Sequence, residues 1–328
     1  MNQTNPSISS FKRPFSTSFR ELSKVKRTSR RNPFYVGKNR SSAQKRHNTR
    51  SVLGIDISLF TPEAFLKTIE HSFRASSLNQ EDKLFIATVN PEFVIDAYYD
   101  AEFREILNQT HLNTADGAGI CLALSGLYQI RQPRITGSDS TEQICKLAAI
   151  YHKRIFLLGA AEGIAEKAAN HLKQRIPDLQ IGGVYSPKNR MDSIEDYPPG
   201  VQKKLQQAEV LFVALGAPAQ EKWISKHLQK LPQCRVAVGI GGTLDFIAGE
   251  VKRAPKWMQG FGVEWLYRLL KNPSRWRRML KIPIFIYLVL KEWVQGHVLS
   301  LFHSNDRRSI EQPILWQIPL IHPISKRY

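Results

Sequence analysis

Four short runs of apolar residues recur along the middle of the chain, and each is followed by a turn that contains glycine. The runs span residues 84–89, 155–158, 210–215 and 236–240. Continuously apolar runs of this length are typical of parallel strands that are buried on both faces of a sheet. Helical patterns lie between them, for example at 164–175 and 218–231. The pattern predicts an α/β fold, an open and mostly parallel Rossmann-like sheet with helices on both faces.

Charge divides the chain into three parts. Residues 1–50 hold 13 basic residues and one acid, residues 51–250 hold 20 basic and 23 acidic residues, and residues 251–328 hold 14 basic residues and four acids. We expect a disordered basic tail over 1–50, although an organelle transit peptide has a similar composition. The near-neutral middle, 51–250, is expected to form the core. Residues 251–303 are expected to add a basic helical appendage, and 304–328 stay unassigned.

The appendage combines basic and aromatic side chains. Nine Lys or Arg residues alternate with Trp, Tyr and Phe between 252 and 281, where there is one acid, and Asn272-Pro273 predicts a helix start. This composition is typical of a helix in an anionic headgroup layer, whereas the plainer alternative is a solvated helix packed on the core. The apolar run 282–290 is too short to span a bilayer. A nucleic-acid-binding protein is a rival interpretation, but no known binding motif supports it.

Polar residues lie at the end of the first predicted strand, 84–89, and again near residue 116. Asp116 lies between Ala115 and Gly117, where a carboxylate can act as a general base in a cleft or can cap the next helix. Thr88 and Asn90 lie at the carboxyl end of the first strand. Their hydroxyl and amide suit sugar or phosphate oxygens, although Asn-Pro-Glu is equally a helix start.

Further turns offer groups that suit phosphate. Arg134 precedes Thr136, Gly137, Ser138 and Asp139, whose amides would lie at a helix N-terminus. The turns after the other predicted strands contain Gly159, Gly216, Gly241 and Gly242. Gln220 can donate and accept hydrogen bonds at a ligand. The acids Glu221 and Asp245 suit helix-dipole or capping roles instead.

Several common classes of site are absent from the sequence. The three cysteines form no CxxC pair, so neither a disulfide framework nor a cysteine-based zinc site is expected. No GxGxxG follows a strand, which argues against a nicotinamide dehydrogenase. No Asp-x-Asp occurs, and the nine histidines show no metal-ligand spacing. We therefore predict no metal and no cofactor.

Seven motifs follow one another along the chain: Thr88-Val-Asn90-Pro-Glu92, Ala115-Asp116-Gly117, Thr136-Gly-Ser138-Asp139, Gly216-Ala-Pro218-Ala-Gln220-Glu221-Lys-Trp223, Gly241-Gly242-Thr-Leu-Asp245-Phe246, Arg253-Ala-Pro255-Lys-Trp257-Met and Glu264-Trp265-Leu-Tyr267-Arg268. In this order they resemble the WecG/TagA/CpsF family, glycosyltransferase family 26, across roughly residues 52–290. The resemblance implies an inverting, metal-independent enzyme. Its expected reaction moves a hexose, typically N-acetylmannosamine, from a UDP-sugar to an undecaprenyl-diphosphate-linked N-acetylglucosamine. Glucose or mannosaminuronic acid is an alternative donor sugar.

The resemblance also implies roles for individual residues. Asp116 is the expected general base, with Thr88 and Asn90 in the same pocket and Arg134 and Gln220 in contact with substrate. Further expected binding residues are Gly117, Gly137, Ser138, Asp139, Gly159, Gly216, Gly241, Gly242, Arg253, Trp257, Arg268, Arg275 and Arg278. The last three match arginines of the family's appendage, which closes over the active site and binds diphosphate.

The expected partners are the UDP-sugar, the lipid-linked acceptor and an anionic membrane surface, at the cytoplasmic face of the plasma membrane. No specific nucleic acid is expected, and a homo-oligomer is possible. A catalytically silent nucleotide-sugar binder is the second rival interpretation, because the same scaffold would bind without transfer.

Overall fold

The computed structural model describes residues 48–75, 82–189, 193–260 and 262–303, with side chains up to residue 296. These residues belong to one compact unit, Ser42–Tyr328. Most of the predicted basic tail, Phe261 and residues 304–328 lie outside the described residues. Strand β1 (Thr49–Val52) pairs with β2 (Ile55–Ser58) as an antiparallel hairpin, so regular structure begins at Thr49, one residue before the predicted end of the tail.

In the described part of the chain, six parallel strands form the main sheet, in the order β4-β3-β8-β7-β5-β6. They are β3 (Leu84–Val89), β4 (Leu112–Ala115), β5 (Ile155–Gly159), β6 (Ile181–Tyr185), β7 (Val210–Ala214) and β8 (Val236–Gly239). The four predicted strands are confirmed to within one residue at each end. The Rossmann-like α/β fold is confirmed as well.

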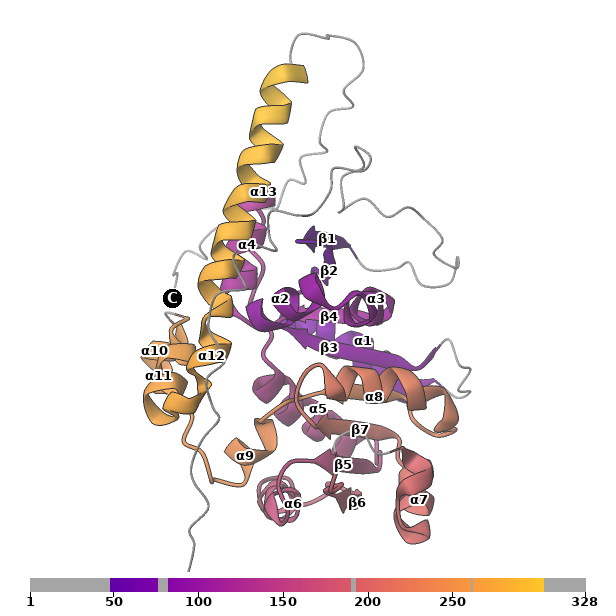
Figure 1. The fold of residues 1–328 in the computed structure, drawn as a ribbon. Helices are drawn as coiled ribbons and strands as arrows, with labels where there is room; N and C mark the ends of the chain where they lie inside the picture. Colours follow the sequence, from indigo (N-terminus) through magenta and orange to yellow (C-terminus); the bar gives the residue numbers. More distant parts are fainter. Residues whose placement is uncertain (1–47, 76–81, 190–192, 261, 304–328) are drawn as a thin grey trace, which may run out of the picture. The chain divides into compact units, whose positions relative to one another are not determined.

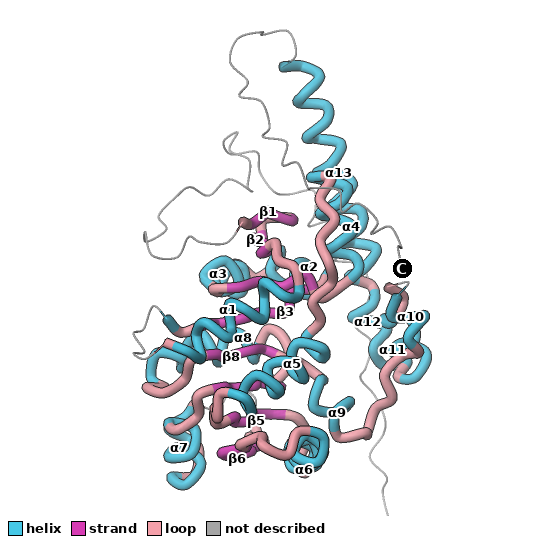
Figure 2. Tube along the Cα trace, turned by 180° about the vertical axis from the view of Figure 1, so that it is seen from behind, coloured by secondary structure: helices cyan, strands magenta, loops and turns pink. Residues whose placement is uncertain are grey.

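Helices cover both faces of this sheet. The helices α2 (Pro91–Tyr99), α3 (Ala101–Gln109), α7 (Pro199–Gln206) and α8 (Ala219–His227) lie over the face seen in Figure 1. The other face, seen in Figure 2, carries α1 (Pro62–Arg74), α5 (Gly137–Ile150), α6 (Ile164–Arg175) and the short α9 (Thr243–Ile247). The helix α4 (Ala118–Tyr128) follows β4, and the 3-10 turns η3 (Ile194–Asp196) and η4 (Leu228–Lys230) complete the core. The predicted helices at 164–175 and 218–231 correspond to α6 and to α8 with η4.

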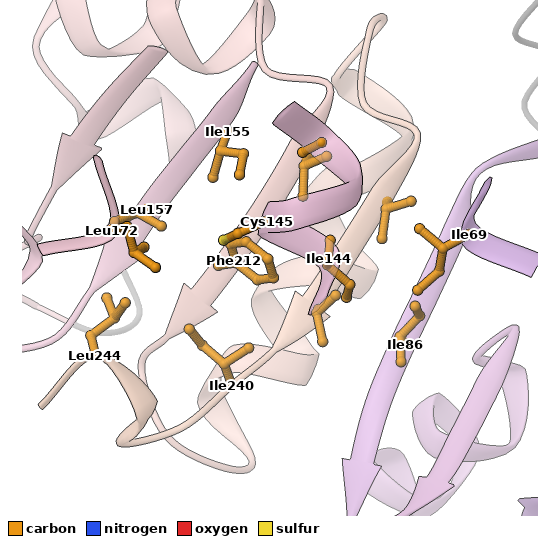
Figure 3. Close-up of a cluster of buried hydrophobic side chains, with 14 of the residues drawn as sticks. Ile69, Ile86, Ile144, Cys145, Ile155, Leu157, Leu172, Phe212, Ile240 and Leu244 are labelled. Carbon is orange, nitrogen blue, oxygen red and sulfur yellow. The ribbon is translucent and has the colours of Figure 1, made fainter. Parts of the chain in front are cut away.

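The largest buried cluster fills the space between the sheet and α1, α5 and α6 (Figure 3). Phe212 of β7, Ile144 of α5 and Ile69 of α1 are all fully buried in it. Burying apolar area of this kind contributes roughly 25 cal/mol per Å². The sheet is therefore a rigid platform for the loops at its ends.

The connections of the sheet change sides between β3 and β8. β3 leads into α2, whose Phe93 packs with Val89 in the cluster on one face. β8 leads into α9, whose Leu244 packs with Val238 in the cluster on the other face. Neighbouring parallel strands whose loops leave to opposite faces open a crevice at their carboxyl ends, where open α/β sheets bind ligands. The fold therefore places a ligand site beyond the ends of β3 and β8.

Strand β4 was missed by the sequence pattern because its middle residues are polar. Asn113 is buried, and its amide nitrogen donates to the carbonyl oxygens of Asp56 and Leu107, at 2.8 and 2.6 Å. The Asn113 side-chain oxygen accepts a hydrogen bond from the Thr110 hydroxyl at 2.8 Å. A buried polar side chain is tolerated when its hydrogen bonds are satisfied.

The predicted appendage is helical. It comprises α10 (Lys256–Gly260), α11 (Glu264–Lys271), η5 (Pro273–Arg275), α12 (Trp276–Met279) and α13 (Lys281–His303). Pro273 starts a helical turn as predicted, although the Asn272 side chain does not cap it.

Helix α13 has a buried and an exposed apolar face. It contacts α2 and α4 (Figure 1) through Phe285, which is 2% exposed, and the Glu292 carboxylate accepts a 3.2 Å hydrogen bond from the backbone N–H of Leu53. The outward face carries exposed Ile286, Tyr287, Leu290, Trp293 and Val294. Among the described residues, no helix has both the length and the hydropathy that crossing a bilayer requires.

Candidate active site

Asp116 follows β4 directly and lies beside the end of β3. Its backbone N–H donates to the carbonyl oxygen of Val89 at 2.9 Å, and the residue is partly buried. The N-cap of α4 is Gly117, and no side chain caps this helix. The capping interpretation of Asp116 is therefore wrong, which leaves its carboxylate for the crevice.

Two glycines allow the β4–α4 turn to approach the β3–α2 turn. A Cβ atom on Gly117 would lie 2.7 Å from Cδ of Pro91, and a Cβ atom on Gly119 would lie 2.7 Å from Cγ of the same proline. Such distances are too short for real side chains. Gly117 therefore contributes by close packing, which brings Asp116 next to Asn90.

The pKa of Asp116 is raised to about 6, mainly because burial disfavours the carboxylate. A hydrogen bond from the Gly137 backbone and the charges of Arg268 and Arg134 lower it, while the carboxylate of Glu264 raises it. A general base works best when its pKa lies near the operating pH. At neutral pH this carboxylate is mostly ionised and can still accept a proton.

Arg268 and Glu264 bring the appendage to Asp116. The Arg268 guanidinium pairs with Glu264 at 2.8 Å and lies 4.6 Å from the ring centre of Phe246 in α9. Both residues of this pair are close enough to Asp116 to change its pKa, in opposite directions. The predicted site residue Arg268 thus lies at the crevice.

Arg275 and Arg278 extend this cationic cluster across the crevice. Nε of Arg278 donates to the Glu92 carboxylate at 2.7 Å, and Glu92 is the second residue of α2. Arg275 is partly buried, and its pKa is lowered by burial and by its neighbours Arg278 and Arg268. Arg278 thus contacts α2, and Arg268 contacts α9, while their closing role stays a prediction. We call Arg268, Arg275 and Arg278 the arginine cluster.

The side chains of Thr88 and Asn90, on either side of Val89, form hydrogen bonds with the backbone. The Thr88 hydroxyl is 4% exposed and donates to the carbonyl oxygen of Gly239 at 3.1 Å. The Asn90 side-chain oxygen accepts from the backbone N–H groups of Glu92 and Phe93, at 2.9 and 3.2 Å. The helix-start interpretation of Asn90 is therefore confirmed. The Thr88 hydroxyl thus joins β3 to β8, and its predicted contact with substrate stays a prediction.

Gln220 is also held inside the protein. It is 1% exposed, and its side-chain oxygen accepts from the backbone N–H groups of Gly216 and Gly241, at 3.2 and 2.9 Å. Its amide nitrogen donates to Glu221 at 2.6 Å. The amides of Gly216 and Gly241, predicted to bind phosphate, are therefore already used. In this structure Gln220 makes its hydrogen bonds within the protein, and its predicted contact with substrate stays a prediction.

The first turn of α5 forms an ion pair with the appendage. The Thr136 hydroxyl donates to the Asp139 carboxylate at 2.7 Å, and the guanidinium of Arg253 donates to both Asp139 oxygens, at 2.6 and 3.2 Å. Ser138 lies 3.4 Å from the Thr243 hydroxyl at the start of α9. Asp139 and Arg253 thus form an ion pair between α5 and the appendage, and their predicted role as direct ligands stays a prediction.

The remaining predicted binding residues, three glycines and Trp257, do not lie together. A Cβ atom on Gly159 would lie 2.6 Å from the carbonyl carbon of Ala214, and β5 is separated from β8 by β7, so Gly159 serves packing away from the crevice. A Cβ atom on Gly137 would lie 3.2 Å from Oγ1 of Thr88. Gly242 is the N-cap of α9, and Trp257 on α10 is exposed.

The sequence did not assign roles to two acids of the site, Glu92 and Glu264. Glu264 is the one acid between residues 252 and 281. A single acid among basic residues could have indicated a role for Glu264, because such an acid is expected to form an ion pair with one of them. In the described ranges, no group of three or more His, Cys, Asp and Glu side chains is arranged to hold a metal ion.

A parallel sheet with a switch point between β3 and β8, a carboxyl group of pKa about 6 and a nearby arginine cluster are features of a Rossmann-like α/β enzyme. The chain belongs to the glycosyl transferase WecG/TagA/CpsF family, whose family model matches residues 50–298. It is similar to the N-acetylglucosaminyldiphosphoundecaprenol N-acetyl-beta-D-mannosaminyltransferases of Staphylococcus aureus strains MW2 and COL. Each is 34% identical over 252 residues, which cover 76% of this chain and 96% of the relative. The resemblance of the seven motifs is confirmed.

Replacing Glu264 with glutamine tests its influence on Asp116. Loss of the Glu264 charge should lower the pKa of Asp116, and Arg268, released from its ion pair, should act in the same direction. Because the base must be deprotonated to work, we expect the acid limb of the pH–rate profile to move to lower pH. The measurement is kcat/KM from pH 4.5 to 8, and a limb that stays in place or moves to higher pH would contradict the assignment.

Replacing Gly117 with alanine tests the close approach of the two turns. The added methyl would overlap the ring of Pro91, and overpacking of this kind costs roughly 1–3 kcal/mol. We expect a lower melting temperature together with a large loss of turnover. The matched control is Gly126→Ala in α4, where an added Cβ meets nothing within 4 Å and alanine favours the helix. Equal melting temperatures for the Gly117 variant and the unchanged protein would refute the packing argument.

Proposed function

We propose that the chain transfers N-acetylmannosamine from a UDP-sugar to an undecaprenyl-diphosphate-linked N-acetylglucosamine, with inversion and without a metal ion. The observation that carries the proposal is the placement of Asp116, with its pKa of about 6, next to the arginine cluster at one crevice. The names of the S. aureus relatives, which cover most of the chain, support the sugar and the acceptor. The relatives' names do not specify the donor nucleotide, which the family motifs suggest.

The proposed reaction is a single displacement. Asp116 accepts the proton of the acceptor hydroxyl, and the hydroxyl oxygen forms a bond to the anomeric carbon of the donor. The bond between that carbon and the β-phosphate oxygen breaks, and UDP leaves with the electron pair. Attack from the side opposite to UDP inverts the anomeric carbon. The base and the departing diphosphate therefore need separate places at the crevice.

The arginine cluster supplies positive charge for the leaving diphosphate. Guanidinium groups pair with phosphate oxygens through two parallel hydrogen bonds, and fixed charges of this kind stabilise negative charge that develops in the transition state. The charge of Arg134 lowers the pKa of both Asp116 and Asp139, so it also lies near the proposed base. Its proposed role is contact with the substrate.

We also propose that the appendage holds the enzyme at an anionic membrane, at the cytoplasmic face of the plasma membrane where the lipid-linked acceptor lies. Trp257, Trp276 and Leu280 of the appendage are exposed, as are the apolar side chains on the outward face of α13. Between 252 and 281, the exposed basic residues outside the arginine cluster are Lys252, Lys256, Lys271 and Arg277. Each contributes about 1 kcal/mol when it is close to such a surface.

The double variant Tyr287→Ser, Leu290→Ser tests this membrane contact. Both side chains are more than half exposed on α13, so the fold should persist. We expect weaker cosedimentation with anionic liposomes and unchanged turnover of a short, soluble acceptor analogue. The control is Ile150→Ser on α5, which is similarly exposed and should bind liposomes like the unchanged protein. Equal liposome binding by the double variant and the control would refute the contact.

The reaction itself is tested with a panel of UDP-sugars and a short polyprenyl-diphosphate-linked N-acetylglucosamine, with product mass as the readout. We expect the highest rate with UDP-N-acetylmannosamine and no loss of rate in a chelator. A higher rate with UDP-glucose or the uronic acid would correct the donor. Inactivation by chelator with recovery on added magnesium would overturn metal independence.

A further inference from the structure

Glu221 is a buried acid whose position the proposed reaction does not yet explain. It is fully buried in the first turn of α8, and one of its carboxylate oxygens accepts the 2.6 Å hydrogen bond from Gln220. Its other carboxylate oxygen is buried without a hydrogen-bond partner. A buried carboxylate is costly, and each unsatisfied polar atom in a native structure needs an explanation.

The contacts of Gln220 suggest that explanation. Its side-chain oxygen bridges Gly216, in the turn after β7, and Gly241, in the turn after β8. Both glycines have positive φ angles, +78° and +52°, in the left-handed region that glycine favours. One side-chain amide thus joins two turns from neighbouring strands. Its own orientation depends on the bond from its nitrogen to Glu221.

The backbone of β8 is shaped around this pair. A Cβ atom on Gly239 would lie 2.5 Å from Oε1 of Glu221 and 2.7 Å from Nε2 of Gln220. The strand therefore packs directly on the hydrogen bond between the two side chains. Glu221, Gln220 and the two turns form one connected unit, which we call the turn clamp.

We propose that Glu221 is a positioning residue for the donor site: through Gln220 it sets the spacing of the β7 and β8 turns that form the wall for the nucleotide diphosphate. This inference rests on the proposed UDP-sugar donor. The donor side is favoured because Asp116, which activates the acceptor, lies on the far side of β3 from these turns. The β8 turn leads into α9, and α9 contacts the arginine cluster that meets the leaving diphosphate.

The test compares Glu221→Leu, which removes the acceptor for Gln220, with Glu221→Gln, which keeps an oxygen in its place. In the full chain we expect the leucine variant to raise the Kd for UDP and the donor KM at least tenfold and to leave the acceptor KM within twofold. The glutamine variant should restore UDP binding to within threefold of the unchanged protein. A purely structural role would lower the folded fraction and kcat while leaving both KM values unchanged, and that result would overturn the inference.

Gln220→Met provides a second route, should the leucine variant not fold. It removes the bridge itself and should raise the Kd for UDP by a similar factor. Combining it with Glu221→Gln should add no further loss, because groups that act in series are not additive. UDP binding by Gln220→Met equal to that of the unchanged protein would overturn the turn clamp. Absence of UDP binding by the unchanged protein would instead overturn the proposed donor, and this inference with it.

Discussion

Replacing Asp116 with asparagine should abolish most of the transfer activity and leave UDP binding intact. Positioned general bases contribute roughly 10²–10⁴-fold to rate, and we expect a loss of this size. Asparagine keeps the shape of the side chain and an oxygen for the Gly137 hydrogen bond, but it cannot accept the proton of the acceptor hydroxyl. Transfer is measured under single-turnover conditions, and UDP binding is measured by titration calorimetry.

The pH dependence gives a second readout of the same residue. The rate of the unchanged enzyme should fall as the pH drops through about 6, because Asp116 then becomes protonated. The pKa of Asp116 is raised from 3.8 to about 6 in the folded protein. The folded protein therefore loses stability as the pH rises from about 4 to about 6. The asparagine variant should therefore melt at an equal or higher temperature than the unchanged protein at pH 7.5.

Asp100→Asn is the matched control for this substitution. Asp100 caps α3 through the N–H of Phe103, and asparagine caps a helix about as well as aspartate. The control should therefore keep both stability and turnover. Unchanged turnover in the Asp116 variant would remove it as the base and would favour the silent nucleotide-sugar binder.

Replacing Arg275 with glutamate should cause the second largest loss. Arg275 is partly buried and close enough to Arg268 and Arg278 for their charges to lower its pKa, and its Nε has no hydrogen-bond partner in the described structure. Loss of one preorganised group that stabilises transition-state charge costs roughly 10²–10³ in kcat. We expect a decrease of that size with a soluble acceptor analogue.

Arg277→Glu is the matched control, because it makes the same change in net charge two residues away. Arg277 is exposed and lies over the ring of Trp276, 5.5 Å from its centre. Both variants should lose similar affinity for anionic liposomes, whereas the Arg277 variant should keep its turnover within a few-fold. Equal turnover losses in the two variants would show that Arg275 acts only through the surface charge.

The core of the fold could be predicted because its signal is local. Runs such as 210–215 are apolar at every position, which a two-sided parallel sheet requires. The hairpin β1–β2 and the strands β4 and β6 were missed. In β4, the burial of Asn113 depends on partners at Asp56 and Thr110, outside the strand. In β6, Gly182 and Gly183 interrupt the apolar pattern at the edge of the sheet.

For the candidate site, the sequence named Asp116, Arg134 and Arg268, and the structure places both arginines close enough to lower the pKa of Asp116. The roles inside the motifs were less predictable. Gln220 and Asp139 have the chemistry of ligands, yet the structure commits their polar atoms to Gly241 and Arg253. Glu264 reaches Asp116 only because α11 folds back on the core.

By itself, the sequence determined the class of fold, the family and the charge of the appendage, because apolar period, motif order and composition are properties of neighbouring residues. Only the tertiary structure decided which polar groups face the crevice and which hold it together. Each side chain has a limited number of hydrogen bonds, and here many of them are used by partners more than one hundred residues away, as with Thr88 and Gly239. The polar groups that can bind a substrate are those whose hydrogen bonds are not already made within the folded chain.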